Sequence, residues 1–73
     1  MKELHNLLKE CCPLIDFRKE KKLITNKIID SMDIVNIIDA IENKYNISIE
    51  FEMINAENFD SIEAMDAMIK KLK

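Results

Sequence analysis

The sequence predicts a small all-α domain: a bundle of three main helices plus one short helix, with a long first loop. Apolar residues recur at helical spacing in three separate segments. Glycine is absent and proline occurs once, so the glycine-bearing turns typical of β-hairpins are missing. With 73 residues and 48% hydrophobic content, the chain has enough core for a single domain, residues 1–73.

The first helix is predicted from about Lys2 to Cys12. Its apolar residues recur at i, i+3, i+4, i+7 and i+8, which places them on one helical stripe. They are Leu4, Leu7, Leu8, Cys11 and Cys12. Pro13 ends the pattern, because proline forces the preceding residue away from helical geometry. Adjacent cysteines are poorly placed to bridge each other, so we interpret both as buried thiols.

A long connection follows over residues 13–29. We expect its charged run, residues 18–22, to be a solvated face, and the apolar residues on either side to hold the loop against the core. These are Leu14, Ile15 and Phe17 before the run and Leu23 and Ile24 after it. Asn26 is a good turn residue here, because asparagine tolerates left-handed geometry.

The second helix is predicted from Asp30 to about Tyr45. Asp30 can cap it, and Asp33 lies in its first turn, near the positive end of the helix dipole. Asn46 suits the left-handed residue that ends a helix. The expected buried stripe consists of Ile34, Ile37, Ile38, Ile41 and Tyr45.

The segment after the second helix alternates from Ile47 to Phe51. A single five-residue strand has no pairing partner, so we predict an extended loop with Ile47, Ile49 and Phe51 facing inward. A short helical turn is expected around Asn55 to Asn58.

The last helix is predicted from about Ser61 to Leu72. Asp60 and Glu63 resemble a capping box, with aspartate in the usual Ser/Thr position. Its expected stripe consists of Ile62, Met65, Met68, Ile69 and Leu72.

Charge and hydropathy exclude several classes of function. The net charge of −3 argues against a nucleic-acid-binding protein, which usually carries a basic face. No segment reaches the roughly 18 apolar residues of a membrane span, and Met1–His5 lacks a signal-peptide pattern. We therefore expect a soluble, cytoplasmic protein and a monomer. No metal-ligand cluster or phosphate-binding loop is present in the sequence.

The segment Ile28–Val35 carries the most informative pattern. It reads Ile-Ile-Asp-Ser-Met-Asp-Ile-Val and puts an unburied serine, Ser31, at the first position of the longest helix. This resembles the attachment site of acyl, peptidyl and D-alanyl carrier proteins, which have Asp-Ser-Leu or Asp-Ser-Met at the start of the second helix. The order of the helices also resembles that of the family, as does the segment 51–62. The resemblance implies an acyl-carrier-like bundle.

The resemblance further implies that Ser31 bears 4′-phosphopantetheine, taken from coenzyme A by a separate phosphopantetheinyl transferase. The thiol of the arm would carry an acyl or aminoacyl group as a thioester between adenylating ligases or synthases, as in fatty acid or secondary metabolite biosynthesis. The chain itself would not be an enzyme. A serine needs a neighbouring base to become a nucleophile, and none stands beside Ser31, so catalysis in trans fits. A helix N-terminus also favours the phosphodiester anion.

Two apolar residues, Met32 and Val35, share a face with Ser31 and are predicted to dock partners. The acids predicted on the same docking surface are Asp30, Asp33, Asp39 and Glu42. Three departures from fatty-acid carriers, at residues 27–29, Asn36 and Asp39, indicate a docking face unlike that of a typical fatty-acid synthase carrier. The form Ile-Ile-Asp-Ser-Met favours a D-alanyl or aminoacyl carrier, although the cargo stays open.

The alternative is an unmodified helical interaction module that docks through the second helix, with Ser31 only a capping or first-turn residue. The triplet Asp60-Ser61-Ile62 shows that Asp-Ser-apolar also occurs elsewhere in the chain, where we interpret it as a helix cap. A hydrolase built on Ser31 would lack both a base and an oxyanion site. We interpret Met53 as core filler and His5 as a surface residue.

Overall fold

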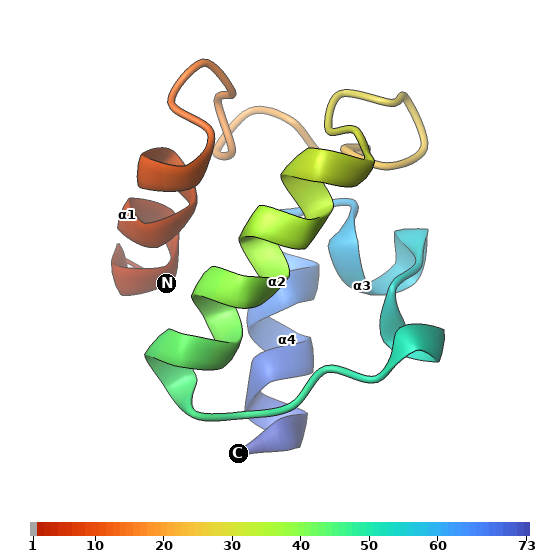
Figure 1. Ribbon diagram of the computed structural model, residues 1–73. Coiled ribbons are helices and arrows are strands. Elements are labelled where there is room, and N and C mark those ends of the chain that lie inside the picture. The colour runs from red at the N-terminus through yellow and green to blue at the C-terminus, as the bar shows by residue number, and fades with distance from the viewer. Residues whose placement is uncertain (1) are drawn as a thin grey trace.

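The computed structural model describes residues 2–73. Its helices are α1 (Lys2–Cys11), α2 (Ser31–Tyr45), the 3-10 helix η1 (Phe51–Met53), α3 (Ala56–Phe59) and α4 (Ile62–Leu72). The described residues contain no strand, which confirms the all-α prediction. α1 packs against α2 and α4, and the short α3 packs against α4, as Figure 1 shows.

One continuous core joins the three long helices. Each predicted stripe contributes to it, either with fully buried residues or with half-buried ones packed against them. The buried set is Leu4, Leu8, Cys12, Phe17, Leu23, Ile29, Ile37, Ile41, Phe59, Ile62, Met65, Met68 and Ile69. Three of these residues, Phe17, Leu23 and Ile29, come from the long loop and hold it to the bundle; Phe17 and Leu23 were predicted to do so, and Ile29 was not. Leu14 is the exception, since its side chain is 99% exposed.

Both predicted ends of α2 are confirmed. Asp30 is the N-cap and forms a reciprocal capping box with Asp33. Asn46 ends the helix with φ 56° and ψ 49°, in the left-handed region. Its backbone N–H donates to the carbonyl oxygen of Glu42, so a helix in a chain without glycine still receives a regular C-terminus.

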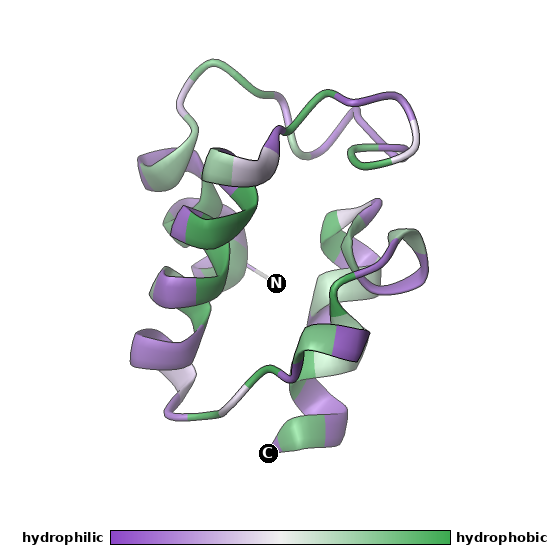
Figure 2. Ribbon diagram, turned by 45° about the vertical axis from the view of Figure 1, so that its right-hand side comes forward, coloured by the Kyte–Doolittle hydropathy of each residue, from purple (hydrophilic) through white to green (hydrophobic). Residues whose placement is uncertain are grey.

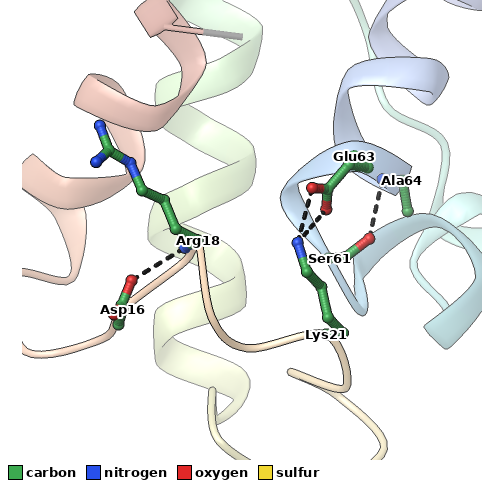
Figure 3. Close-up of polar contacts among 6 residues, drawn as sticks. All are labelled: Asp16, Arg18, Lys21, Ser61, Glu63 and Ala64. Carbon is green, nitrogen blue, oxygen red and sulfur yellow. Dashed lines mark hydrogen bonds and ion pairs between the residues drawn. The ribbon is translucent and has the colours of Figure 1, made fainter.

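The predicted capping box of α4 is wrong. The N-cap is Ser61, whose Oγ accepts a hydrogen bond from the Ala64 N–H at 3.1 Å (Figure 3). Asp60 points elsewhere: its carboxylate accepts bonds from the N–H groups of Ile24 and Thr25, both at 2.9 Å, and from the Thr25 hydroxyl. Asp60 therefore ties the long loop to the start of α4.

The charged run of the loop, residues 18–22, is exposed except for Glu20, which is half-buried. Lys21 in this run forms an ion pair with a residue of the helical bundle. Its Nζ lies 2.7 Å from Oε2 of Glu63 on α4 (Figure 3). This ion pair and the Asp60 contacts both join residues more than thirty positions apart. The long first loop is thus fastened to the C-terminal half of the chain.

Two local predictions need correction. Ile47 and Ile49 are half-buried, but Phe51 is 86% exposed, because the extended backbone ends at Glu50 and the 3-10 turn of η1 begins at Phe51. The left-handed residue of the loop is Lys27, with φ 55°, and not Asn26. The Ile28 N–H donates to Leu23 O and the Lys27 N–H to Ile24 O, which is a Schellman pattern with Lys27 at its left-handed position.

Candidate functional site

The candidate site is centred on Ser31, the first residue of α2. Its side chain is exposed, and the hydrogen bonds of residues 2–73 include none with its hydroxyl group. The hydroxyl is therefore open to solvent at the end of a 15-residue helix, where backbone N–H groups lack intrahelical acceptors. Such a position favours an anionic substituent.

The acids on either side of Ser31 supply the cap in its place. The Asp33 N–H donates to Asp30 Oδ1 at 2.9 Å, and the Asp30 N–H donates to Asp33 Oδ2 at 3.3 Å. Because both carboxylates take part in this exchange, the first turn of α2 is closed without the serine hydroxyl. A capping role for Ser31 is thereby excluded.

The approach to Ser31 is fixed by the end of the long loop. Ile29 and Leu23 are buried, and the N–H groups of Ile28 and Ile29 both donate to the carbonyl oxygen of Leu23. The Leu23 N–H in turn donates to Asp60 O at 2.9 Å. The two residues before Asp30 are thus held against the bundle, and the serine emerges from an anchored segment.

A buried thiol lies behind the capping box. Burial, and then the negative charge of Asp33, raise the pKa of Cys12 to about 11. Cys11 is only half-buried, which corrects the prediction of two buried thiols. Its pKa is also raised, first by this partial burial and then by Glu10 and Asp39. Both thiols therefore stay protonated at neutral pH, which makes them weak nucleophiles and poor bases toward Ser31.

The predicted docking residues fall into two groups. Met32 and Val35 are 67% and 59% exposed on α2, and Asp39 is exposed beyond them. The acids with internal contacts form the second group. Asp30 and Asp33 cap the helix, while Glu42 is half-buried and its Oε2 accepts the Ile49 N–H at 2.8 Å.

The sequence did not point to two features near the long loop. Leu14 lies outside the stripe of α1, and its place directly after Pro13 is the one signal for its exposure. The capping-box pattern predicts the wrong partner for Asp60, because the N–H groups that its carboxylate binds are 35 and 36 positions away. No pattern in a single sequence reports such a contact.

Comparison of the chain with protein-family models, with curated proteins and with solved structures finds no match. Within residues 2–73, no three His, Cys, Asp or Glu side chains are grouped so that they could hold a metal ion. None of the helices formed by these residues has both the length and the apolar composition needed to cross a membrane.

Proposed function

We propose that this chain is a carrier protein of the acyl, peptidyl or D-alanyl carrier type, with 4′-phosphopantetheine attached to Ser31. We further propose that the chain is a cytoplasmic monomer and that an adenylating ligase or synthase attaches the acyl or aminoacyl group to its arm. The proposal rests on the resemblance of the segment 28–35 to the carrier signature. The observation that supports it best is the exposed Ser31 hydroxyl, which the fold does not use.

The chemistry of attachment is consistent with the surroundings of Ser31. Its oxygen would form a bond to phosphorus as the pyrophosphate link of coenzyme A breaks and the adenosine bisphosphate portion leaves. The hydroxyl proton needs a base from the transferase, because the nearest carboxylates, Asp30 and Asp33, accept N–H groups of the cap. The phosphodiester product would lie at the N-terminus of α2, where the dipole partly offsets repulsion from the two acids.

The mass of the intact protein tests the proposal. We expect the native chain to gain one phosphopantetheine during incubation with coenzyme A, magnesium and a broad-specificity phosphopantetheinyl transferase. Ser31→Ala should gain nothing. A carrier of known competence in the same tube controls for the transferase, and a folded native chain that stays unmodified beside it contradicts the proposal.

The alternative is an unmodified interaction module, and the exposure of Met32 and Val35 favours it specifically. The two functions differ in their dependence on a single oxygen atom. A docking module should retain its partner when Ser31 is replaced by alanine and lose it when Met32 and Val35 are replaced by serine. A carrier loses its cargo in the first variant.

A further inference from the structure

Two adjoining hollows lie beside α1: the larger between α1 and the loop that follows it, and the smaller between α1, that loop and the start of α4. The larger, of about 600 Å³, is lined by residues 13–16 and four basic side chains: His5, Lys9, Arg18 and Lys19. The smaller, of about 390 Å³, shares His5 and Arg18 and adds Lys2. We call these five side chains the basic surface. They gather in one region of a chain whose net charge is −3.

No side chain of the basic surface forms an ion pair within residues 2–73, where the ion pairs join Lys21 to Glu63 and Lys70 to Asp66. Two acids, Asp16 and Glu63, also line the hollows, so basic side chains outnumber acids there. Asp16 Oδ1 accepts a hydrogen bond from the backbone N–H of Arg18 at 3.1 Å, and Glu63 pairs with Lys21. The Arg18 side chain extends away from Asp16 toward α1 (Figure 3).

An apolar side chain projects beside these charges. Leu14 is 99% exposed at the turn after α1, and Pro13 before it is also exposed. Figure 2 shows the outer bend of this loop in the colour of hydrophobic residues, next to hydrophilic segments. The fold gains nothing from Leu14, so its side chain is available to an external apolar phase.

We propose that the basic surface and Leu14 bind the surface of an anionic lipid membrane. A plane of anionic headgroups can meet several dispersed cations at once, and each lysine or arginine near it strengthens binding about fivefold. A projecting leucine can enter the boundary between headgroups and acyl chains. The remaining surface of the chain is acidic, so repulsion would turn it away from the membrane and orient the molecule.

A protein partner fits these observations less well. Stable protein interfaces bury about 800 Å² on each side around several apolar anchors, and lysine is depleted from them. Here the exposed apolar part is limited to Leu14 and the neighbouring Pro13, and lysines form much of the charge. The hollows take no lining residue from α2, so membrane binding leaves Ser31 free and does not depend on the carrier proposal.

Sedimentation of the full chain with lipid vesicles tests this inference. We expect binding to vesicles of phosphatidylcholine mixed with phosphatidylglycerol, and none to vesicles of phosphatidylcholine alone. Added salt should release the protein, since screening shortens the reach of exposed charges. Circular dichroism of each variant verifies that its helices are intact.

The variants separate the two parts of the surface. Lys9→Gln, Arg18→Gln and Lys19→Gln should each weaken binding about fivefold, and the triple variant about a hundredfold. Leu14→Ser should weaken it about tenfold, the value for burying most of a leucine side chain. Lys71→Gln on α4 removes one charge outside the basic surface and is the matched control, which we expect to bind like the native chain.

Three outcomes would overturn the proposal. The first is equal binding to the two kinds of vesicle, or no binding to either. The second is a Lys71→Gln variant that loses as much affinity as Lys9→Gln, which would mean that net charge alone acts. The third is release by millimolar inorganic phosphate at constant ionic strength, which would assign the surface to free phosphate-bearing molecules and not to a membrane.

Discussion

The triplet Asp-Ser-apolar starts two helices of this protein, and the two copies use their side chains differently. At α2, Asp30 is the cap, Ser31 is the first helical residue and Met32 is exposed. At α4, Ser61 is the cap and Ile62 is the first helical residue, buried to 3% exposure. The helix therefore begins one residue later in the second triplet.

The difference arises from the other bonds that each aspartate makes. The Asp30 carboxylate accepts a hydrogen bond from the N–H of Asp33, its neighbour in the first turn, so Asp30 is the cap. The Asp60 carboxylate instead accepts hydrogen bonds from the N–H groups of Ile24 and Thr25 in the long loop. The next residue, Ser61, therefore caps the helix. Tertiary contacts thus decide which side chain of the pair stays free. A serine is left unused where the aspartate caps, and it is consumed where the aspartate is occupied elsewhere.

The largest expected effect is on covalent modification. If the first triplet is the attachment site, Ser31→Ala abolishes transfer of phosphopantetheine, whereas Ser61→Ala leaves it complete, because the Ser61 hydroxyl is committed to Ala64. Mass measurement of the tryptic peptides that contain each serine checks both variants. Modification of Ser61, or of Ser31→Ala, would remove the functional distinction between the triplets.

The apolar residues of the triplets should differ strongly in their effect on stability. Ile62→Ala opens a cavity in the core and should lower the free energy of unfolding by about 3 kcal/mol. Met32→Ala should change it by less than about 0.5 kcal/mol, since the side chain is exposed. Urea denaturation followed by circular dichroism measures both. Similar losses for the two variants would contradict the burial that separates Ile62 from Met32.

The caps come next in size. Asp30→Ala and Ser61→Ala should each lower the free energy of unfolding by about 1 kcal/mol, because each leaves a first-turn N–H without its acceptor. Ser31→Ala is the matched control, because Ser31 is the first helical residue and its hydroxyl caps nothing. It should change the free energy of unfolding by only a few tenths of a kcal/mol. The same urea titrations test this order. If Ser31→Ala is as destabilising as Asp30→Ala, the serine hydroxyl does support the helix.

The smallest expected effect is a pH dependence. Hydrogen bonds from the Thr25 hydroxyl, and then from its N–H, lower the pKa of Asp60 below its ordinary value of 3.8. A pKa lowered by folding means that the carboxylate contributes stability above the unfolded value, and that this contribution is lost as the pH falls through the folded value. Between about pH 5 and about pH 2, the native chain should lose more stability than Asp60→Asn.

The control for this prediction is the native chain measured in parallel. Glu63, whose pKa is also lowered, chiefly by its bond with Lys21, adds an acid sensitivity that every variant shares. Only the difference between each variant and the native chain is therefore informative. Urea midpoints measured across the pH range should converge for Asp60→Asn and the native chain at the acidic end. Parallel curves would show that the loop contacts of Asp60 do not depend on its charge.

Local signals predicted most of the fold. The three helical stripes, the Asp30 cap and the left-handed Asn46 each depend on residues within a few positions of one another, and the structure contains all of them. The position of Ser31 follows from the same local rules, since a cap at Asp30 makes the next residue the first of the helix. Its proposed modification is a matter of resemblance and stays a prediction.

Features that depend on distant partners were missed. The start of α4 was displaced by one residue because Asp60 bonds to Ile24 and Thr25 across the fold. The alternating pattern predicts that the Phe51 side chain faces the core. Alternation predicts which side chains face the core only while the backbone stays extended, and η1 begins at Phe51. The basic surface brings a helix and a loop together, so neither segment predicts it alone.

The Asp30–Asp33 capping box has a consequence for the turnover expected of the protein in a cell. Proteases act mainly on opened chains, and the rate of such turnover follows the balance between folded and open forms. A substituent on the Ser31 oxygen displaces no bond of the native structure. Bare and substituted chains should therefore be degraded at similar rates. If Ser31 bears the proposed arm, unmodified protein would persist until it is modified.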